Sequence, residues 1–236
     1  MFKFRAVKTR LILLTTLCLG RFAIAAPPPD AHEILRVVRQ AQSSQHQTLL
    51  GQLRNGPKVV PFRLIIDGGV IRYQFAAPAE TLQLRLLEKD SRLDEITKGG
   101  TEKITAAHFD DKVRDTDISY EDLALKFLYW SNAAVEGEQT LLLQKCWIVR
   151  TEPSGKNDSQ YSRVMLWIEQ KGGALLQAEA YDRTGALSKR FKVVSGQKID
   201  GFWTLKQMRI ETLGTGASKD RTPTYLEISG SEKAAR

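Results

Sequence analysis

The densest set of residues that could do chemistry is a run of acidic side chains between positions 110 and 122. Paired carboxylates can act as general acid and base, and several together can hold calcium. Lys112 and Arg114 interrupt the run, and acidic residues near the start of a helix also stabilise its dipole, so the structural interpretation is favoured and the chemical one stays open. The acids are Asp110, Asp111, Asp115, Asp117, Glu121 and Asp122.

Histidine and cysteine do not occur at spacings that are typical of a catalytic or metal site. His32, His46 and His108 form no H-x-x-x-H pattern, and no C-x-x-C pattern is present. Cys146 lies inside an apolar strand pattern, where a buried thiol is unreactive. No G-x-S-x-G motif for a serine nucleophile occurs either. The sequence therefore predicts no metal site, no cofactor and no enzymatic activity.

The first 25 residues have the pattern of a secretory signal peptide. A basic start precedes the apolar run LILLTTLCLG, whose length of about ten residues is half of the roughly 20 that cross a bilayer. Small residues at Ala23 and Ala25 predict cleavage after Ala25, which leaves a single soluble domain of residues 26–236 in the periplasm. Arg21 is unusual in such a signal, so an uncleaved anchor stays open.

Two further features of the sequence limit the possible partners. Cys18 follows Leu17 instead of a small residue, so the chain is not expected to be lipid-anchored. The net charge of +8 includes five basic residues of the signal, and the mature chain has a charge of only +3 without a basic run. We therefore expect a monomer that does not bind nucleic acid.

Two segments have the pattern of a helix. Asp30 and Glu33 resemble a capping box before an amphipathic helix at about 30–44. Ser119 and Asp122 form a second box, and the residues that follow to 130 are apolar nearly all round, which predicts a buried helix over 119–130. As a cap alone, Asp122 should contribute about 0.5–2 kcal/mol to stability.

The rest of the chain predicts antiparallel strands separated by turns at Asp67–Gly69, 90–91, 172–173, 182–185 and 200–201. Apolar and polar residues alternate, so one face of the sheet is apolar and needs cover. We expect an α+β fold, mainly antiparallel β, in which a curved sheet wraps around the short helices. The apolar face is equally compatible with an ordinary core and with a ligand surface. The candidate ligand-binding residues are Leu64, Ile66, Tyr73, Phe75, Leu84 and Leu86 from strands, and Phe127 and Trp130 from the second helix.

Several short motifs, in this order and spacing, resemble the outer-membrane lipoprotein-sorting proteins of the LolA/LolB-like superfamily. The most specific is Ser119, Tyr120, Glu121, Asp122 and Leu123. The motifs are TDISYEDL at 116–123, VMLWI at 164–168, AYD at 180–182 with Gly185 and Lys189-Arg190, and IDGFW at 199–203 with Met208. The similarity runs from about residue 32 to the end.

This resemblance implies a half-open β-barrel whose concave apolar face holds acyl chains. It implies a periplasmic carrier that takes lipoproteins or another hydrophobic ligand towards the outer membrane, with inner-membrane release proteins and outer-membrane receptors as partners. Without a lipidation cysteine, the chain is more similar to the soluble shuttle members than to the receptors. A regulatory module that senses lipid or lipoprotein and acts through a protein partner is the alternative.

Overall fold

The computed structural model describes residues 29–155, 158–214 and 222–232, and the predicted signal peptide lies outside these residues. The helices are α1 (Ala31–Ser43) and α2 (Tyr120–Ala124), with 3-10 turns η1 (Ala106–His108), η2 (Val113–Asp115) and η3 (Lys126–Leu128). The strands are β1 (His46–Asn55), β2 (Lys58–Asp67), β3 (Val70–Phe75), β4 (Glu80–Leu86), β5 (Ser91–Thr97), β6 (Gly100–Lys103), β7 (Asn132–Leu141), β8 (Gln144–Glu152), β9 (Tyr161–Glu169), β10 (Leu175–Asp182), β11 (Leu187–Ile199), β12 (Phe202–Thr212) and β13 (Thr224–Ser231).

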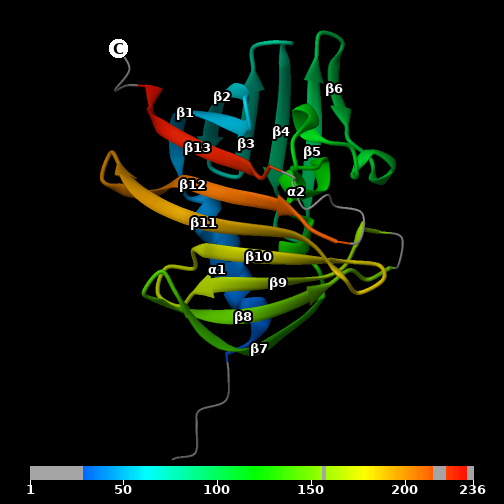
Figure 1. Ribbon diagram of the computed structural model, residues 1–236, viewed down its shortest axis with the longest axis vertical. Helices are drawn as coiled ribbons and strands as arrows, with labels where there is room; N and C mark the ends of the chain where they lie inside the picture. Colours follow the sequence, from blue (N-terminus) through cyan, green and yellow to red (C-terminus); the bar gives the residue numbers. More distant parts are fainter. Residues whose placement is uncertain (1–28, 156–157, 215–221, 233–236) are drawn as a thin grey trace, which may run out of the picture.

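All thirteen strands form one sheet in the order β6-β5-β4-β3-β2-β1-β13-β12-β11-β10-β9-β8-β7. Every neighbouring pair is antiparallel, and β1 pairs with β13, so that the first and last strands join two meanders. In Figure 1, strands β3–β6 run at a steep angle to strands β7–β12. The predicted mainly antiparallel sheet with short helices is confirmed, but the sheet is open, with edges β6 and β7, and is not strongly curled into a half-barrel.

The first predicted helix is present as α1. Asp30 caps it by accepting a hydrogen bond from the His32 backbone N–H at 3.1 Å. The predicted capping box is not completed, because the Glu33 carboxylate pairs with Arg36 at 2.8 Å instead. The apolar stripe packs on β8–β10 and is buried. At the β9–β10 turn Gly173 has φ of +72°, and a Cβ there would lie 2.7 Å from Val37 of α1.

The prediction of one continuous helix over 119–130 is wrong. The capping box of Ser119 and Asp122 is present, but α2 ends at Ala124, and the next residue, Leu125, has a φ of 52° in the left-handed region. A left-handed non-glycine residue costs roughly 1–2 kcal/mol. The reversal directs Phe127 and Leu128 of η3 into the core beside α1, while Leu123 packs under β2–β5. Burial in two separate clusters outweighs the preference for a continuous helix.

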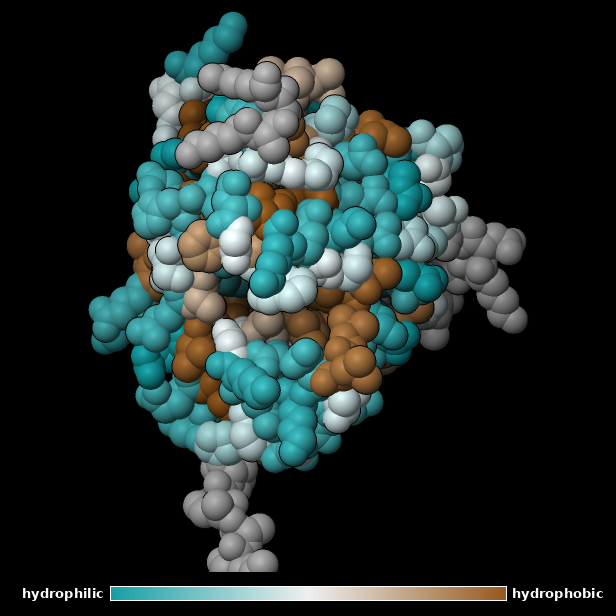
Figure 2. Space-filling model, turned by 90° about the vertical axis from the view of Figure 1, so that its left-hand side faces the viewer, coloured by the Kyte–Doolittle hydropathy of each residue, from teal (hydrophilic) through white to brown (hydrophobic). Residues whose placement is uncertain are grey.

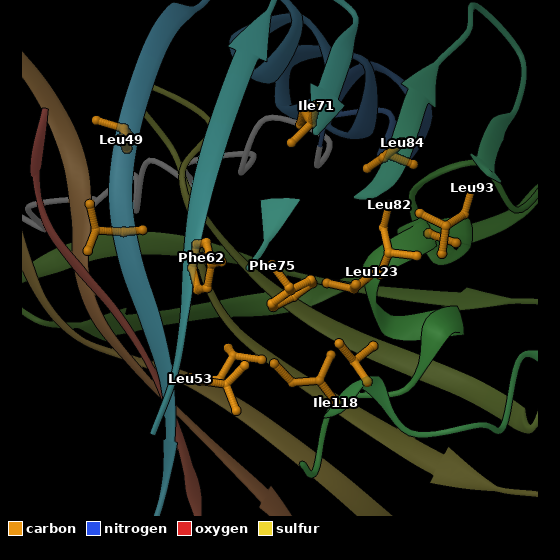
Figure 3. Packing of buried hydrophobic residues seen from close by; sticks show 14 of the residues in the cluster. Leu49, Leu53, Phe62, Ile71, Phe75, Leu82, Leu84, Leu93, Ile118 and Leu123 are labelled. Carbon is orange, nitrogen blue, oxygen red and sulfur yellow. The ribbon is translucent and has the colours of Figure 1, made fainter. Parts of the chain in front are cut away.

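Two hydrophobic clusters therefore cover different parts of the same sheet. The first joins β1–β5 to the segment 113–124 and to β12 and β13, and Figure 3 shows Leu82, Leu93 and Leu123 of this cluster close together. The second joins α1 and η3 to β8–β10.

The prediction that Cys146 is a buried thiol is confirmed, since its side chain is buried in β8 and burial raises the pKa of its thiol. In the described residues, every helix falls short of the length and hydrophobicity that a membrane crossing requires.

A carboxylate on the central strand β13 ties it to its two neighbours. Glu227 accepts hydrogen bonds from Arg54 at 2.7 Å and Gln52 at 2.7 Å on β1, and from Gln207 at 2.8 Å on β12. The Arg54 guanidinium is the main cause that lowers the Glu227 pKa from 4.5 to about 2. The ion pair is partly exposed, and solvent therefore reduces its contribution.

The depressed Glu227 pKa predicts a loss of stability in acid. A carboxylate with a lowered pKa in the folded state stabilises the protein above its unfolded pKa, and that contribution is lost as the pH falls from about 4.5 to about 2. In thermal melts across this range, Glu227→Gln should lose less stability than the parent. An equal fall in melting temperature for both proteins would contradict the assignment.

Candidate functional site

An open cavity of about 380 Å³ lies where the two halves of the sheet meet. Strands β2 and β3 supply one wall, and the segment 118–127 supplies another through Leu123, Leu125 and Phe127. A further wall comes from β12 and β13, with Met208, Ile210, Leu226 and Ile228. Volumes of about 300–1,000 Å³ with mostly apolar walls are typical of small-molecule sites.

The structure brings four of the eight candidate residues to this cavity. Leu64, Ile66, Tyr73 and Phe127 all line it. Across the β2–β3 pair, Leu64 lies opposite Tyr73 and Ile66 lies opposite Ile71, so the lining follows the apolar face that alternation predicted. Burial raises the pKa of Tyr73 to about 12, so its phenol stays neutral at physiological pH.

The other four candidates do not line the cavity. Phe75 and Leu84 are buried in the first hydrophobic cluster, where Leu84 pairs with Ile71 and is fully covered (Figure 3). Leu86 packs against the same cluster, and Trp130 packs against the second one. Phe75, Leu84 and Leu86 share the apolar face with the lining residues, but the segment 113–124 covers that part of the face. Trp130 lies between η3 and β7 and is not part of this face.

A buried ion pair anchors the segment that forms one cavity wall. Asp122 lines the cavity, and its carboxylate accepts from Lys189 Nζ at 2.6 Å, from the Tyr161 hydroxyl at 2.7 Å and from the Ser119 backbone N–H at 2.7 Å. The Asp122 side chain is only 2% exposed and that of Lys189 is 9% exposed. Asp122 therefore both completes the capping box of α2 and pairs with a cation on β11.

Its neighbour Glu121 is held in a second polar contact. The Glu121 carboxylate accepts from the Ser159 hydroxyl and, at 3.0 Å, from the Gln160 backbone N–H. Burial is the main cause that raises the Glu121 pKa. Together the two acids fasten the SYEDL segment to the strands β9 and β11. In this chain those motif residues position a cavity wall.

The remaining acids of the 110–122 run do not converge on one point. Asp117 accepts from Thr212 at 2.7 Å and from Thr224 at 2.9 Å, which joins it to β12 and β13. Asp110, Asp111 and Asp115 are exposed. Within the described ranges no three histidine, cysteine or acidic side chains are grouped to hold a metal ion. This arrangement supports the structural interpretation of the run.

The cavity opens beside the end of the β11–β12 hairpin. Figure 2 shows this side of the molecule, where hydrophobic residues gather in a hollow bordered by hydrophilic ones. Trp203 lines the opening, is 73% exposed, and has the Lys198 ammonium 5.4 Å from the centre of its ring. Gln42 near the end of α1, Gln45 just after α1, and Gln177 on β10 also line the cavity.

Sequence reasoning missed the β12–β13 wall and the glutamines of the lining. Met208 and Ile210 alternate with the polar residues Gln207, Arg209 and Glu211 along β12, so the two-residue period of a strand could have identified them. The glutamines have no local signal. Their position depends on how α1 crosses the sheet.

Comparisons with known proteins agree with this architecture. A family model with the description "Uncharacterized protein" matches residues 98–231. A DUF1329 family protein from Desulfovibrio piger superposes with a TM-score of 0.62 at 22% identity, covering 84% of this chain and 91% of that chain. A proposed outer membrane lipoprotein-sorting protein domain from Vibrio parahaemolyticus gives 0.62 at 16% identity, with coverages of 85% and 92%.

A LolA superfamily protein from Nitrosomonas europaea gives a TM-score of 0.61 at 13% identity and covers 86% of this chain and 92% of that chain. No curated protein matches the chain. At these identities the structural matches establish the fold. The chain has the LolA superfamily fold and, because the family model spans more than half of its length, it belongs to the family that this model describes.

Proposed function

We propose that this protein is a periplasmic carrier that binds an apolar ligand, the acyl part of a lipoprotein or a lipid, in the cavity between the two halves of its sheet. The observation that carries the proposal is the cavity itself. The same apolar face is closely covered around Leu84 and left open around Leu64. An apolar surface that stays open to water costs stability, and a ligand that covers it recovers about 25 cal/mol per Å².

The proposed activity needs no chemical step. The walls exclude water from the ligand, and the ion pair of Asp122 and Lys189 fixes the wall that carries Leu123 and Leu125. The fold shared with the lipoprotein-sorting domain of Vibrio parahaemolyticus supports a carrier that exchanges its ligand with other proteins. Inner-membrane release proteins and outer-membrane receptors are the partners that such a route requires.

Native mass spectrometry of protein purified from a periplasmic extract tests this function. We expect a fraction of the protein to retain an apolar molecule whose mass is released on denaturation. Protein that is free of any such molecule, and that also takes up no fluorescent acyl probe when titrated, would contradict a carrier function.

Ligand entry should change the fluorescence of Trp203. Its indole is 73% exposed beside the opening, so an acyl chain that covers it moves the ring from water to an apolar contact. We expect a blue shift of the emission on titration with a non-fluorescent acyl ligand. Trp203→Phe should lose most of the shift but keep a folded spectrum, and Trp147→Phe, outside the cavity lining, should retain the shift. A shift that persists in Trp203→Phe would place the ligand elsewhere.

A further inference from the structure

Three hairpin turns in the second half of the sheet lie at one end of its strands. Because β7–β12 follow each other as an antiparallel meander, the β7–β8, β9–β10 and β11–β12 turns fall on the same side, at the left of Figure 1. The Gln170 backbone N–H donates to the Lys145 carbonyl at 2.9 Å, which joins the first two turns. We call the surface formed by residues 141–145, 169–175 and 198–203 the turn face.

The β11–β12 hairpin projects beyond its neighbouring strands. Its pairing with β10 ends at Lys192, and its pairing with β13 begins at Gln207. Between these two residues, the described strands pair the hairpin only with itself. Phe202 and Trp203 at its tip are 64% and 73% exposed, and Trp203 also lines the cavity. The hairpin therefore carries two aromatic rings into solvent beside the opening of the cavity.

The β7–β8 turn exposes two leucines in an unfavourable backbone conformation. Leu142 and Leu143 have φ values of 48° and 63°, and Leu143 is 95% exposed. A two-residue turn with both φ values positive favours Asn-Gly or Asp-Gly, because most side chains are strained there. The β11–β12 turn has such a pair in Asp200-Gly201. Neither leucine belongs to the two hydrophobic clusters of the described residues, so strained, exposed leucines here indicate a contact outside the chain.

Lysine side chains accompany the apolar residues of the turn face. Lys145, Lys171 and Lys198 are exposed, and none of them has an acidic partner among the described residues. The acids of the face are Asp200 and Glu169, and the Glu169 carboxylate already accepts the Lys171 backbone N–H at 2.9 Å. The face therefore has an excess of positive charge, which is complementary to an anionic surface.

A membrane surface fits the turn face better than a folded protein does. The apolar tips of the first and third turns are separated by the polar β9–β10 turn, Gln170 to Gly173. Figure 2 looks onto this side and shows apolar patches divided by hydrophilic residues. A protein interface is normally organised around a continuous apolar core. A bilayer interface accepts separate leucine and aromatic side chains among lysines that contact the phosphates.

We propose that the turn face docks on an anionic phospholipid membrane. Leu142, Leu143 and Phe202 enter the interfacial layer, and the lysines of the face contact lipid phosphates. Docking brings Trp203, and with it the opening of the cavity, to the lipid surface. This inference goes beyond the proposed function, because it concerns the outer surface and holds for any ligand that the cavity takes.

Vesicle flotation of the chain without its predicted signal peptide tests the docking. Vesicles of phosphatidylglycerol and phosphatidylethanolamine should bind the protein about fivefold or more tightly than vesicles of phosphatidylcholine. Added salt should reduce this difference, because it screens the lysines. The double variant Leu142→Asn with Leu143→Gly supplies the unstrained turn, so it should be at least as stable as the parent. It should nevertheless bind the anionic vesicles about tenfold or more weakly, and Phe202→Ser should also weaken binding.

The matched control is Val59→Asn. Val59 is an exposed valine beside the β1–β2 turn, at the opposite end of the sheet, where Asn55 pairs with Thr224 and Thr224 pairs with Ile210. This variant should bind vesicles as the parent does. A control that loses as much binding as the double variant would overturn the assignment of the turn face.

The other outcomes separate docking from the proposed function. Docking is overturned if the parent binds neither kind of vesicle, if it binds both kinds equally, or if the double variant binds as the parent does. A parent dimer in sedimentation velocity that the double variant abolishes would assign the face to a second copy and would also overturn it. Acyl-probe uptake by the double variant should be unchanged, because Leu142 and Leu143 do not line the cavity. A parent that binds vesicles but takes up no probe would contradict only the carrier function.

Discussion

Replacing Asp122 by alanine should destabilise the protein by about 3–5 kcal/mol, because it leaves the Lys189 ammonium buried without its counter-charge. The cap alone accounts for only about 0.5–2 kcal/mol of stability. The difference comes from the 2.6 Å contact between Lys189 Nζ and the Asp122 carboxylate, in a place where the two side chains are 9% and 2% exposed. The Tyr161 hydroxyl loses its acceptor at the same time.

Thermal and urea unfolding measure this effect, and the matched control is Asp110→Ala. Asp110 is an exposed acid of the same run, so its removal should change the free energy of unfolding by less than about 0.5 kcal/mol. For Asp122→Ala the melting temperature should fall by about 6–20 °C. A double variant, Asp122→Asn with Lys189→Met, should be less destabilised than the sum of its single variants. A loss of 1 kcal/mol or less for Asp122→Ala would contradict the buried ion pair.

Elements with a local signal were predictable from the sequence. The Asp30 cap, the capping box of Ser119 and Asp122, and the glycine turns each depend on neighbouring residues, and each is present. Alternation placed Leu64, Ile66 and Tyr73 on one face because a strand has a period of two residues. Alternation cannot distinguish an open part of that face from a covered part, and so Phe75 and Leu84 were candidates on equal terms.

Features that depend on distant contacts were not predictable. The continuous apolar pattern of 119–130 fits a helix, but Leu125 reverses the chain so that its two parts reach two different clusters. The partner of Asp122 is Lys189, which is 67 residues away in the sequence. The open sheet also differs from the expected half-barrel, because no local pattern sets the total twist of thirteen strands.

The same polar substitution should have opposite consequences at two leucines of the apolar face. Leu84 is fully buried against Ile71 and the first cluster, so Leu84→Asn loses packing and buries an unpaired amide, at a cost of about 3–5 kcal/mol. Leu64 is half-buried and lines the cavity, so the amide of Leu64→Asn can contact water in the empty site. We expect a cost of about 1–2 kcal/mol there.

The variant with the smaller loss of stability should have the larger loss of ligand affinity. Leu64→Asn should weaken binding of an acyl probe at least tenfold, which is about 1.4 kcal/mol, because the ligand must displace that water and leaves the amide unpaired. Leu84→Asn, where it folds at low temperature, should bind the probe with nearly the affinity of the parent, because Leu84 does not line the cavity.

The most direct test of a ligand-binding cavity is therefore the acyl-probe affinity of Leu64→Asn and Leu84→Asn, measured below the melting temperature of each variant. The cavity predicts a folded Leu64→Asn with at least tenfold weaker binding, and a strongly destabilised Leu84→Asn with nearly unchanged affinity. If Leu64→Asn binds the probe as the parent does, or if the parent binds no probe, the apolar face at Leu64 is ordinary core and the carrier function is wrong.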